Sequence, residues 1–201
     1  GTLNDAIDFP DLEAFSINSY LKELTDLIAI LDWIQNYFKE LPEICLIGHS
    51  RGGGIALLGS NDERVKKIAT WAGISDIARR FPNGEELLTW KNDGVKYTAN
   101  MRTRQKMPLS YIQYEEFDSN RRKLNIEEAC RRYTVPTLII HGTSDTSVDI
   151  SEGKQLATWL NHDLVRIENA NHTFGSQHPW TKHELPNELK EVCEISLNFL
   201  L

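Results

Sequence analysis

A glycine–serine–glycine motif near residue 50 is the part of this sequence with the clearest chemical meaning. The apolar run 44–47 is typical of a buried strand; it ends in Gly48-His49-Ser50-Arg51-Gly52, and a small apolar helical pattern follows at 55–58. A strand-to-helix turn of this form presents a serine at a strained tip as a nucleophile. We expect glycine at both 48 and 52 because a Cβ at either position would collide with the neighbouring strand or helix. We therefore interpret Ser50 as a catalytic nucleophile.

A serine nucleophile needs a base to take its proton, and that base needs a carboxylate to hold it in one tautomer. The strand-like run 137–141 leads into Asp145, and the run 164–167 leads into His172. Both side chains thus follow the carboxyl end of a strand, and the chain order Ser, Asp, His is the order found with this kind of turn. We predict a catalytic triad of Ser50, Asp145 and His172.

Other residues compete for these roles. An aspartate after a strand is often only a turn former, and Asp149 is a second candidate acid, although its place before a helical run favours a cap. His141 ends a strand and is expected to hydrogen-bond its own loop. The remaining histidines lie inside the motif or in polar segments: His49, His162, His178 and His183.

Periodic apolar patterns predict the elements that position the triad. Helices are expected over 17–39, 51–59, 151–161 and 186–201, and strands over 44–47, 67–72, 137–141 and 164–167. Asn18 or Ser19 is placed to cap the first helix, and residues 1–16 suggest a loop. Alternating strands and helices predict an α/β fold with a doubly wound, mostly parallel sheet.

Residues 75–132 interrupt this alternation and are interpreted as an insertion within a single domain of residues 1–201. The part from 79 to 132 holds 12 Lys or Arg against 8 Asp or Glu, whereas the rest of the chain holds 10 against 21. A basic segment therefore accompanies an acidic body. It is either a solvated face that pairs with that body, or a lid that attracts anionic or carboxylate-bearing substrates.

Composition excludes several classes of function. A net charge of -7 disfavours binding to nucleic acid or to an anionic membrane surface. No run approaches the ~20 apolar residues of a membrane span. The three cysteines, Cys45, Cys130 and Cys193, are far apart and outside metal-ligand spacing, which predicts no metal and fits a reducing, cytoplasmic setting.

Three segments give the chain a family resemblance. Gly48-His49-Ser50-Arg51-Gly52-Gly53, His141-Gly142-Thr143-Ser144-Asp145 and Asn171-His172-Thr173-Phe174 resemble the active-site segments of the α/β-hydrolase superfamily. Within it, the chain is most similar to bacterial serine esterases related to dienelactone hydrolases, cinnamoyl esterases and the prolyl oligopeptidase group. Dienelactone hydrolases proper use a cysteine nucleophile, and Ser50 stands here instead, which points away from that activity.

The resemblance implies hydrolysis of a small-molecule carboxylic ester through an acyl-enzyme, without a metal or an organic cofactor. A peptidase or thioesterase using the same triad, or a non-catalytic ligand-binding relative, stays open. The resemblance also implies that the backbone N–H of Arg51 is one of two groups that donate hydrogen bonds to the oxyanion. The second donor belongs to an early loop that this chain lacks, together with several strands. We therefore expect an exposed edge at the strand before Ser50, and a chain that is part of a longer protein or that relies on another chain.

Candidate substrate-lining residues are large apolar side chains, although those in the insertion alternatively form a small core of their own. They are Trp71, Trp90, Met101, Met107 and Phe174, with Tyr97 and Phe117 as further candidates.

Overall fold

The computed structural model describes residues 8–100, 103–132, 135–177 and 179–201. These residues form two compact units. One unit is built from the chain up to Thr25 together with Ala78–Leu124, and the other from Asp26–Ile77 and Asn125–Leu201. The long helix α2 (Tyr20–Tyr37) contributes to both. Met101, a candidate substrate residue, lies outside the described residues.

The second unit contains the predicted parallel sheet. Its four strands are β1 (Ile44–His49), β2 (Val65–Trp71), β5 (Thr137–Gly142) and β6 (Leu164–Ile167), in the order β1-β2-β5-β6. Every neighbouring pair is parallel, so all four carboxyl ends meet at one edge of the sheet. The four strand predictions are confirmed, each within a few residues.

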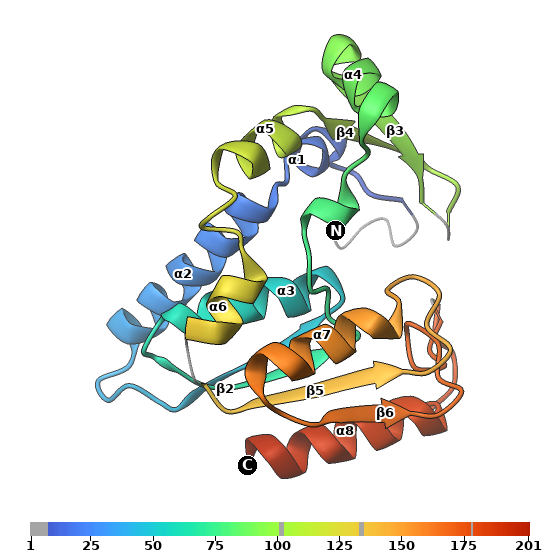
Figure 1. The fold of residues 1–201 in the computed structure, drawn as a ribbon. Helices are drawn as coiled ribbons and strands as arrows, with labels where there is room; N and C mark the ends of the chain where they lie inside the picture. Colours follow the sequence, from blue (N-terminus) through green and yellow to red (C-terminus); the bar gives the residue numbers. More distant parts are fainter. Residues whose placement is uncertain (1–7, 101–102, 133–134, 178) are drawn as a thin grey trace. The chain divides into compact units, whose positions relative to one another are not determined.

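Helices cover both faces of this sheet (Figure 1). On one side lie α3 (Arg51–Leu58), α6 (Ile126–Arg132) and α7 (Ile150–Leu160), and on the other lies α8 (Asn187–Leu200). This arrangement confirms the doubly wound α/β class. Short 3-10 turns add Gly59–Asn61 to this unit and Ala78–Arg80 to the other.

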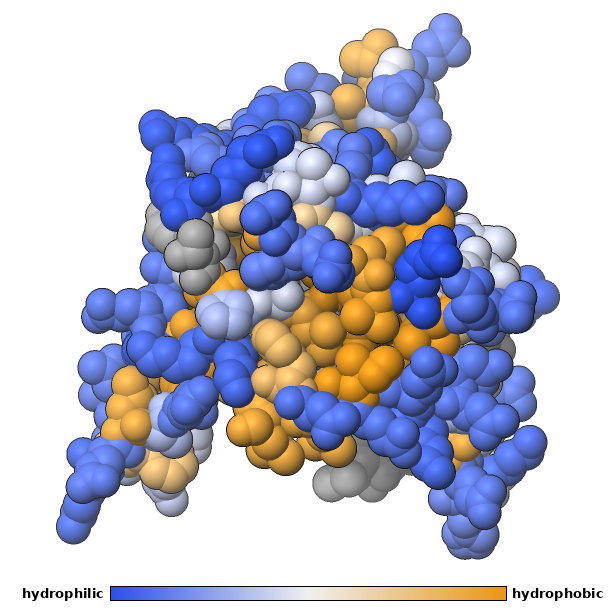
Figure 2. Space-filling view, turned by 60° about the horizontal axis from the view of Figure 1, so that its bottom comes forward, coloured by the Kyte–Doolittle hydropathy of each residue, from blue (hydrophilic) through white to orange (hydrophobic). Residues whose placement is uncertain are grey.

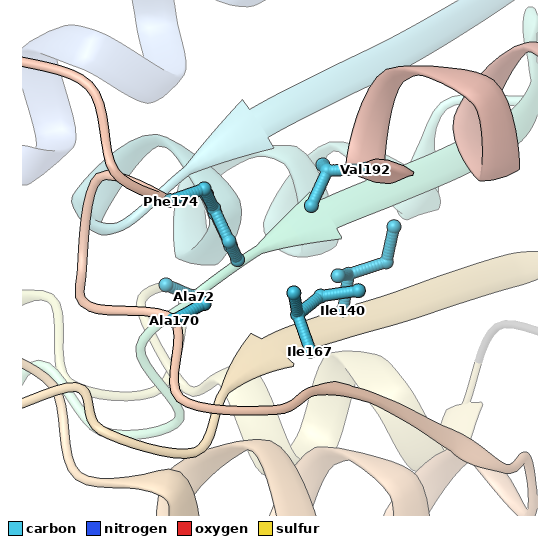
Figure 3. Close-up of a cluster of buried hydrophobic side chains, with 6 residues drawn as sticks. All are labelled: Ala72, Ile140, Ile167, Ala170, Phe174 and Val192. Carbon is cyan, nitrogen blue, oxygen red and sulfur yellow. The ribbon is translucent and has the colours of Figure 1, made fainter. Parts of the chain in front are cut away.

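A buried apolar cluster joins α8 to the carboxyl ends of the strands. It consists of Ala72, Ile140, Ile167, Ala170, Phe174 and Val192, each at most 1 % exposed. Figure 3 shows these side chains converging from the ends of β2, β5 and β6, from the loop beyond β6 and from α8. Burying a Val, Ile or Phe side chain stabilises a protein by about 1.5–3 kcal/mol. The cluster therefore fixes the loop that carries His172.

β1 lies at one edge of the described sheet, as expected for the strand before Ser50. Its Ile47 is 54 % exposed, and Leu197 of α8 is exposed to a similar extent. Figure 2 shows a face of the molecule on which apolar side chains gather between hydrophilic margins.

Exposed Trp33 and Tyr37 on α2 stack with ring centroids 4.9 Å apart. Among the described residues, no helix combines the length and apolar character that crossing a membrane requires.

The first unit differs most from the sequence-based expectation. Residues 1–16 were expected to form a loop, but α1 spans Leu12–Ser16 because the carboxylate of Asp11 accepts the Ala14 N–H and caps its first turn. Ser19 caps α2 by accepting the Lys22 N–H at 3.1 Å, which confirms one of the two cap candidates.

The insertion contains elements that its sequence does not reveal. They are α4 (Gly84–Asp93), an antiparallel hairpin of β3 (Val95–Ala99) and β4 (Lys106–Ser110), and α5 (Ile112–Ser119). Phe81 contacts the rings of Trp90, Tyr114 and Phe117 and forms a small aromatic core within this unit. The unit ends at Leu124, so α6 belongs to the other unit. That the insertion acts as a lid stays a prediction.

Candidate active site

The turn from β1 to α3 holds Ser50 in a strained backbone conformation. Ser50 has φ 55° and ψ −120°, a region that side-chain-bearing residues rarely adopt. Two bonds to the end of β2 and to the segment after it hold Ser50 there: the Ser50 N–H donates to the Trp71 carbonyl at 2.9 Å, and the Ile74 N–H donates to the Ser50 carbonyl at 3.2 Å. The half-buried side chain thus stands at the tip of the turn, as a nucleophile elbow requires.

The close contacts at this turn explain Gly48 and Gly53, whereas the motif suggests Gly48 and Gly52. A Cβ at Gly48 would lie 2.3 Å from the Gly52 carbonyl oxygen, so glycine is required there as expected. The expectation for Gly52 is wrong, because a Cβ on it would meet no atom within 4 Å. The crowded position is Gly53, where a Cβ would lie 2.8 Å from Gly73 Cα.

Asp145 and His172 are joined directly at the carboxyl edge of the sheet. The distance from His172 Nδ1 to Asp145 Oδ2 is 2.7 Å. The other oxygen, Oδ1, accepts the N–H groups of Ser147 and Val148 at 2.8 and 2.9 Å. The carboxylate is fully buried, whereas the His172 side chain keeps 19 % exposure. Asp145 therefore orients an imidazole whose far side faces outward.

Burial and hydrogen bonding act on Asp145 in opposite directions. Burial is the largest single influence and raises the pKa of its carboxyl group. The bond from His172, together with the backbone N–H groups of Val148 and Ser147, outweighs that influence and leaves the pKa below its ordinary value. Asp145 is thus ionised at neutral pH. Asp149, the other candidate acid, caps α7 instead by accepting the Ser151 N–H at 2.8 Å.

His49 links the serine turn to the histidine loop. Its Nε2 lies 2.8 Å from the carbonyl oxygen of His172, and the two rings are 4.6 Å apart between centroids. Burial of the ring is the main reason why the pKa of His49 lies below its ordinary value. The link brings the loop of His172 beside Ser50, the residue that follows His49.

The Ser50 hydroxyl has no hydrogen-bond partner in the part of the chain that the structure describes. Bonds between a nucleophile and its base are often long in the absence of substrate. The bond between Ser50 and His172 that the predicted triad requires therefore stays a prediction.

Arg51 opens α3, so its backbone N–H lies at the positive end of the helix dipole, directly after Ser50. This is the place where an oxyanion donor belongs. Within the described ranges, His, Cys, Asp and Glu side chains nowhere gather in threes as metal ligands would.

The candidate substrate residues lie in several environments. Phe174 is 1 % exposed within the apolar cluster under the histidine loop, and that packing explains its presence without a substrate. Trp71 packs on the same cluster and donates its indole N–H to Ser196 Oγ at 2.9 Å. Trp90 and Met107 are buried in the other unit. Tyr97 is 53 % exposed.

Sequence reasoning missed a buried acid that supports the serine turn from a distance. Glu152 on α7 is 3 % exposed, and its Oε2 accepts the Ser75 N–H at 2.8 Å. This bond holds the segment whose Ile74 is tied to Ser50. No local pattern marks Glu152, because its partner is 77 residues away in the chain.

Comparison with known proteins agrees with the fold. The fold is that of the α/β-hydrolases: a putative hydrolase from Agrobacterium vitis matches with a TM-score of 0.71 and 17% identity over 94% of this chain and 71% of its own. The ferulic acid complex of Est1E from Butyrivibrio proteoclasticus matches with a TM-score of 0.68 and 21% identity over 92% and 70%. At these identities the likeness concerns the fold alone.

The family is established by sequence. The model of the prolyl oligopeptidase family matches residues 14–190, and the chain belongs to that family. It is therefore a member of a hydrolase family. An esterase domain of a Rhodothermus marinus protein also matches, with a TM-score of 0.53 and 21% identity over 78% of this chain, and this chain spans 61% of that one. A comparison with curated proteins finds no match.

Proposed function

We propose that this chain is a serine hydrolase that cleaves carboxylic esters through an acyl-enzyme. The observation that carries the proposal is the 2.7 Å contact between His172 Nδ1 and the buried Asp145 carboxylate. It lies at the same sheet edge as Ser50, whose strained backbone is typical of a nucleophile.

In the proposed reaction, Ser50 Oγ attacks the ester carbonyl carbon while His172 Nε2 takes its proton. Asp145 holds His172 in the tautomer that carries its proton on Nδ1, and it stabilises the imidazolium that then forms. The Arg51 N–H stabilises the negative charge on the former carbonyl oxygen. Collapse of the tetrahedral intermediate breaks the ester C–O bond, and the alcohol leaves with the proton from His172. Water then repeats the sequence on the acyl-enzyme and frees the acid.

The matched family supports a second candidate, a peptidase, because its description is that of prolyl oligopeptidases. A peptidase would use the same three side chains. The difference lies in the leaving group, an amine in place of an alcohol. A panel that sets p-nitrophenyl acetate and methyl ferulate against a proline-containing peptide anilide separates the two. Methyl ferulate is included because a neighbour in fold binds ferulic acid.

The test of the proposal is covalent labelling with a fluorophosphonate, which reacts with activated serines. The wild-type chain is expected to be labelled at one site, and Ser50→Ala is expected to abolish both labelling and ester turnover. Ser151→Ala, which changes an exposed serine at the start of α7, is the matched control and should behave as wild type. Labelling or ester turnover that survives in Ser50→Ala within a few fold of wild type overturns the proposal.

A further inference from the structure

A fully buried histidine that the proton relay does not use stands behind the acid. His141 is the penultimate residue of β5 and is 0 % exposed. Its Nε2 lies 2.9 Å from the carbonyl oxygen of Val148 and 3.4 Å from Asp145 Oδ2. A carbonyl oxygen only accepts hydrogen bonds, so Nε2 carries a proton. The expectation that His141 bonds its own loop is confirmed.

The other ring nitrogen of His141, Nδ1, is buried against α7. His141 Nδ1 is buried without a hydrogen-bond partner among the described residues. It faces α7 at Gly153, where a Cβ would lie 2.8 Å from Nδ1 and 3.2 Å from Cγ. A proton on this nitrogen would be buried without an acceptor, which is costly. The packing therefore selects the tautomer that has its single proton on Nε2, directed toward the acid loop.

The loop from Gly142 to Val148 closes on this ring. At its far end, the Val148 carbonyl accepts from His141, while the Val148 N–H donates to Asp145 Oδ1. Asp145 Oδ2 lies between two imidazoles, 2.7 Å from His172 Nδ1 and 3.4 Å from His141 Nε2. The loop, the carboxylate and the buried ring thus form one hydrogen-bonded unit.

We propose that His141 is a positioning residue for the acid, holding the Asp145 carboxylate in the orientation that His172 requires. This inference rests on the proposed function, because it concerns the same three side chains. Its structural part is separate: His141 sets the geometry of the Asp145–His172 bond whether or not a substrate is turned over. Gly153 is part of this positioning arrangement, because only a residue without a side chain leaves room for the His141 ring.

The test compares two replacements of the ring. His141→Gln retains an amide N–H near the position of Nε2, whereas His141→Leu has no donor. We expect His141→Leu to lower the rate of fluorophosphonate labelling and the kcat of ester hydrolysis about tenfold, with KM unchanged. In His141→Gln both rates should stay within about threefold of wild type. The low-field proton resonance of the His172–Asp145 bond should persist in His141→Gln and weaken or shift in His141→Leu. A merely structural role would lower only the melting temperature.

Gly153→Ala provides a second perturbation that leaves the histidine in place. Its methyl group would push the ring away from α7, so labelling and the resonance should change in the same direction as in His141→Leu. If His141→Leu does not fold, Gly153→Ala and His141→Gln decide the question. His162→Leu, at an exposed histidine beyond α7, is the control and should match wild type.

The possible failures are distinguishable. Folded His141→Leu and Gly153→Ala proteins that keep the wild-type labelling rate and resonance overturn the positioning role while the triad stands. A wild-type chain that no fluorophosphonate labels contradicts the proposed hydrolase, and the resonance in the variants still decides the role of His141.

Discussion

Replacement of Asp145 by asparagine removes one charge and reverses one hydrogen bond. The Asp145 Oδ1 atom accepts two backbone N–H groups, from Ser147 at 2.8 Å and from Val148 at 2.9 Å. An asparagine must keep its single oxygen toward these donors, so its NH₂ group takes the place of Oδ2 and faces His172 Nδ1. Two donors do not bond, and His172 is forced into the tautomer with its proton on Nε2. That nitrogen then has no lone pair to accept the serine proton.

The expected loss follows from this change of tautomer. In a Ser-His-Asp enzyme the same exchange lowers kcat by about 10⁴ with the geometry intact, and we expect a comparable loss for Asp145→Asn if the proposed function holds. The cost to folding is small by contrast. A charge-assisted hydrogen bond contributes about 1.5–3 kcal/mol and a neutral one about 0.5–1.5 kcal/mol, so the free energy of unfolding should fall by about 1 kcal/mol. Labelling rate, ester turnover and urea unfolding measure the three quantities.

Asp149→Asn is the matched control for this exchange. Asp149 caps α7 through its Oδ1 atom, and asparagine caps a helix about as well as aspartate. The control should therefore keep both activity and stability. A folded Asp145→Asn protein that reacts within tenfold of wild type would refute the reasoning, as would an equal loss of activity in Asp149→Asn.

Three further predictions concern the supports of the site. Gly48→Ala should destabilise the chain by at least about 1–3 kcal/mol in urea unfolding, since its Cβ would lie 2.3 Å from a backbone oxygen that has no room to yield. Phe174→Ala should cost about 3–5 kcal/mol by the same measurement, because the ring is 1 % exposed; a smaller loss than 1 kcal/mol would contradict its place in the core. His49→Gln should make stability depend less on pH between about 7 and 5. The folded pKa of His49 is below its ordinary 6.5, so the unfolded chain binds the proton first and wild-type stability is lost as pH falls; equal pH profiles of the two proteins would contradict this.

The elements of the second unit follow from the sequence because each is apolar and locally patterned. The runs before Ser50, Asp145 and His172 are short apolar strands, and parallel strands must align their carboxyl ends. Chain order and this alignment are enough to nominate the three side chains. The contact of Asp145 with His172 thus required no knowledge of distant residues.

The sequence does not predict the elements of the insertion, because they are stabilised by contacts between distant segments and not by a local periodic pattern. The hairpin of β3 and β4 is short and only partly buried, and its pairing is set between residues that the sequence separates, such as Val95 and Ser110. Phe81 and the aromatic residues that pack around it come from three segments. Charge and aromatic content alone therefore indicated an interruption without its internal structure.

The contrast between Gly52 and Gly53 shows where motif reasoning ends. The motif counts residues from the serine, so it selects Gly52, yet the crowding arises from a segment beyond β2 that the motif does not contain. The same holds for α7, where Glu152 bonds the segment behind the serine turn and Gly153 makes room for His141 behind the acid. Two consecutive residues of one helical turn thus support both ends of the proposed relay. Because each acts through a partner distant in the chain, only the folded arrangement reveals that the serine and its acid are held from the same turn of helix.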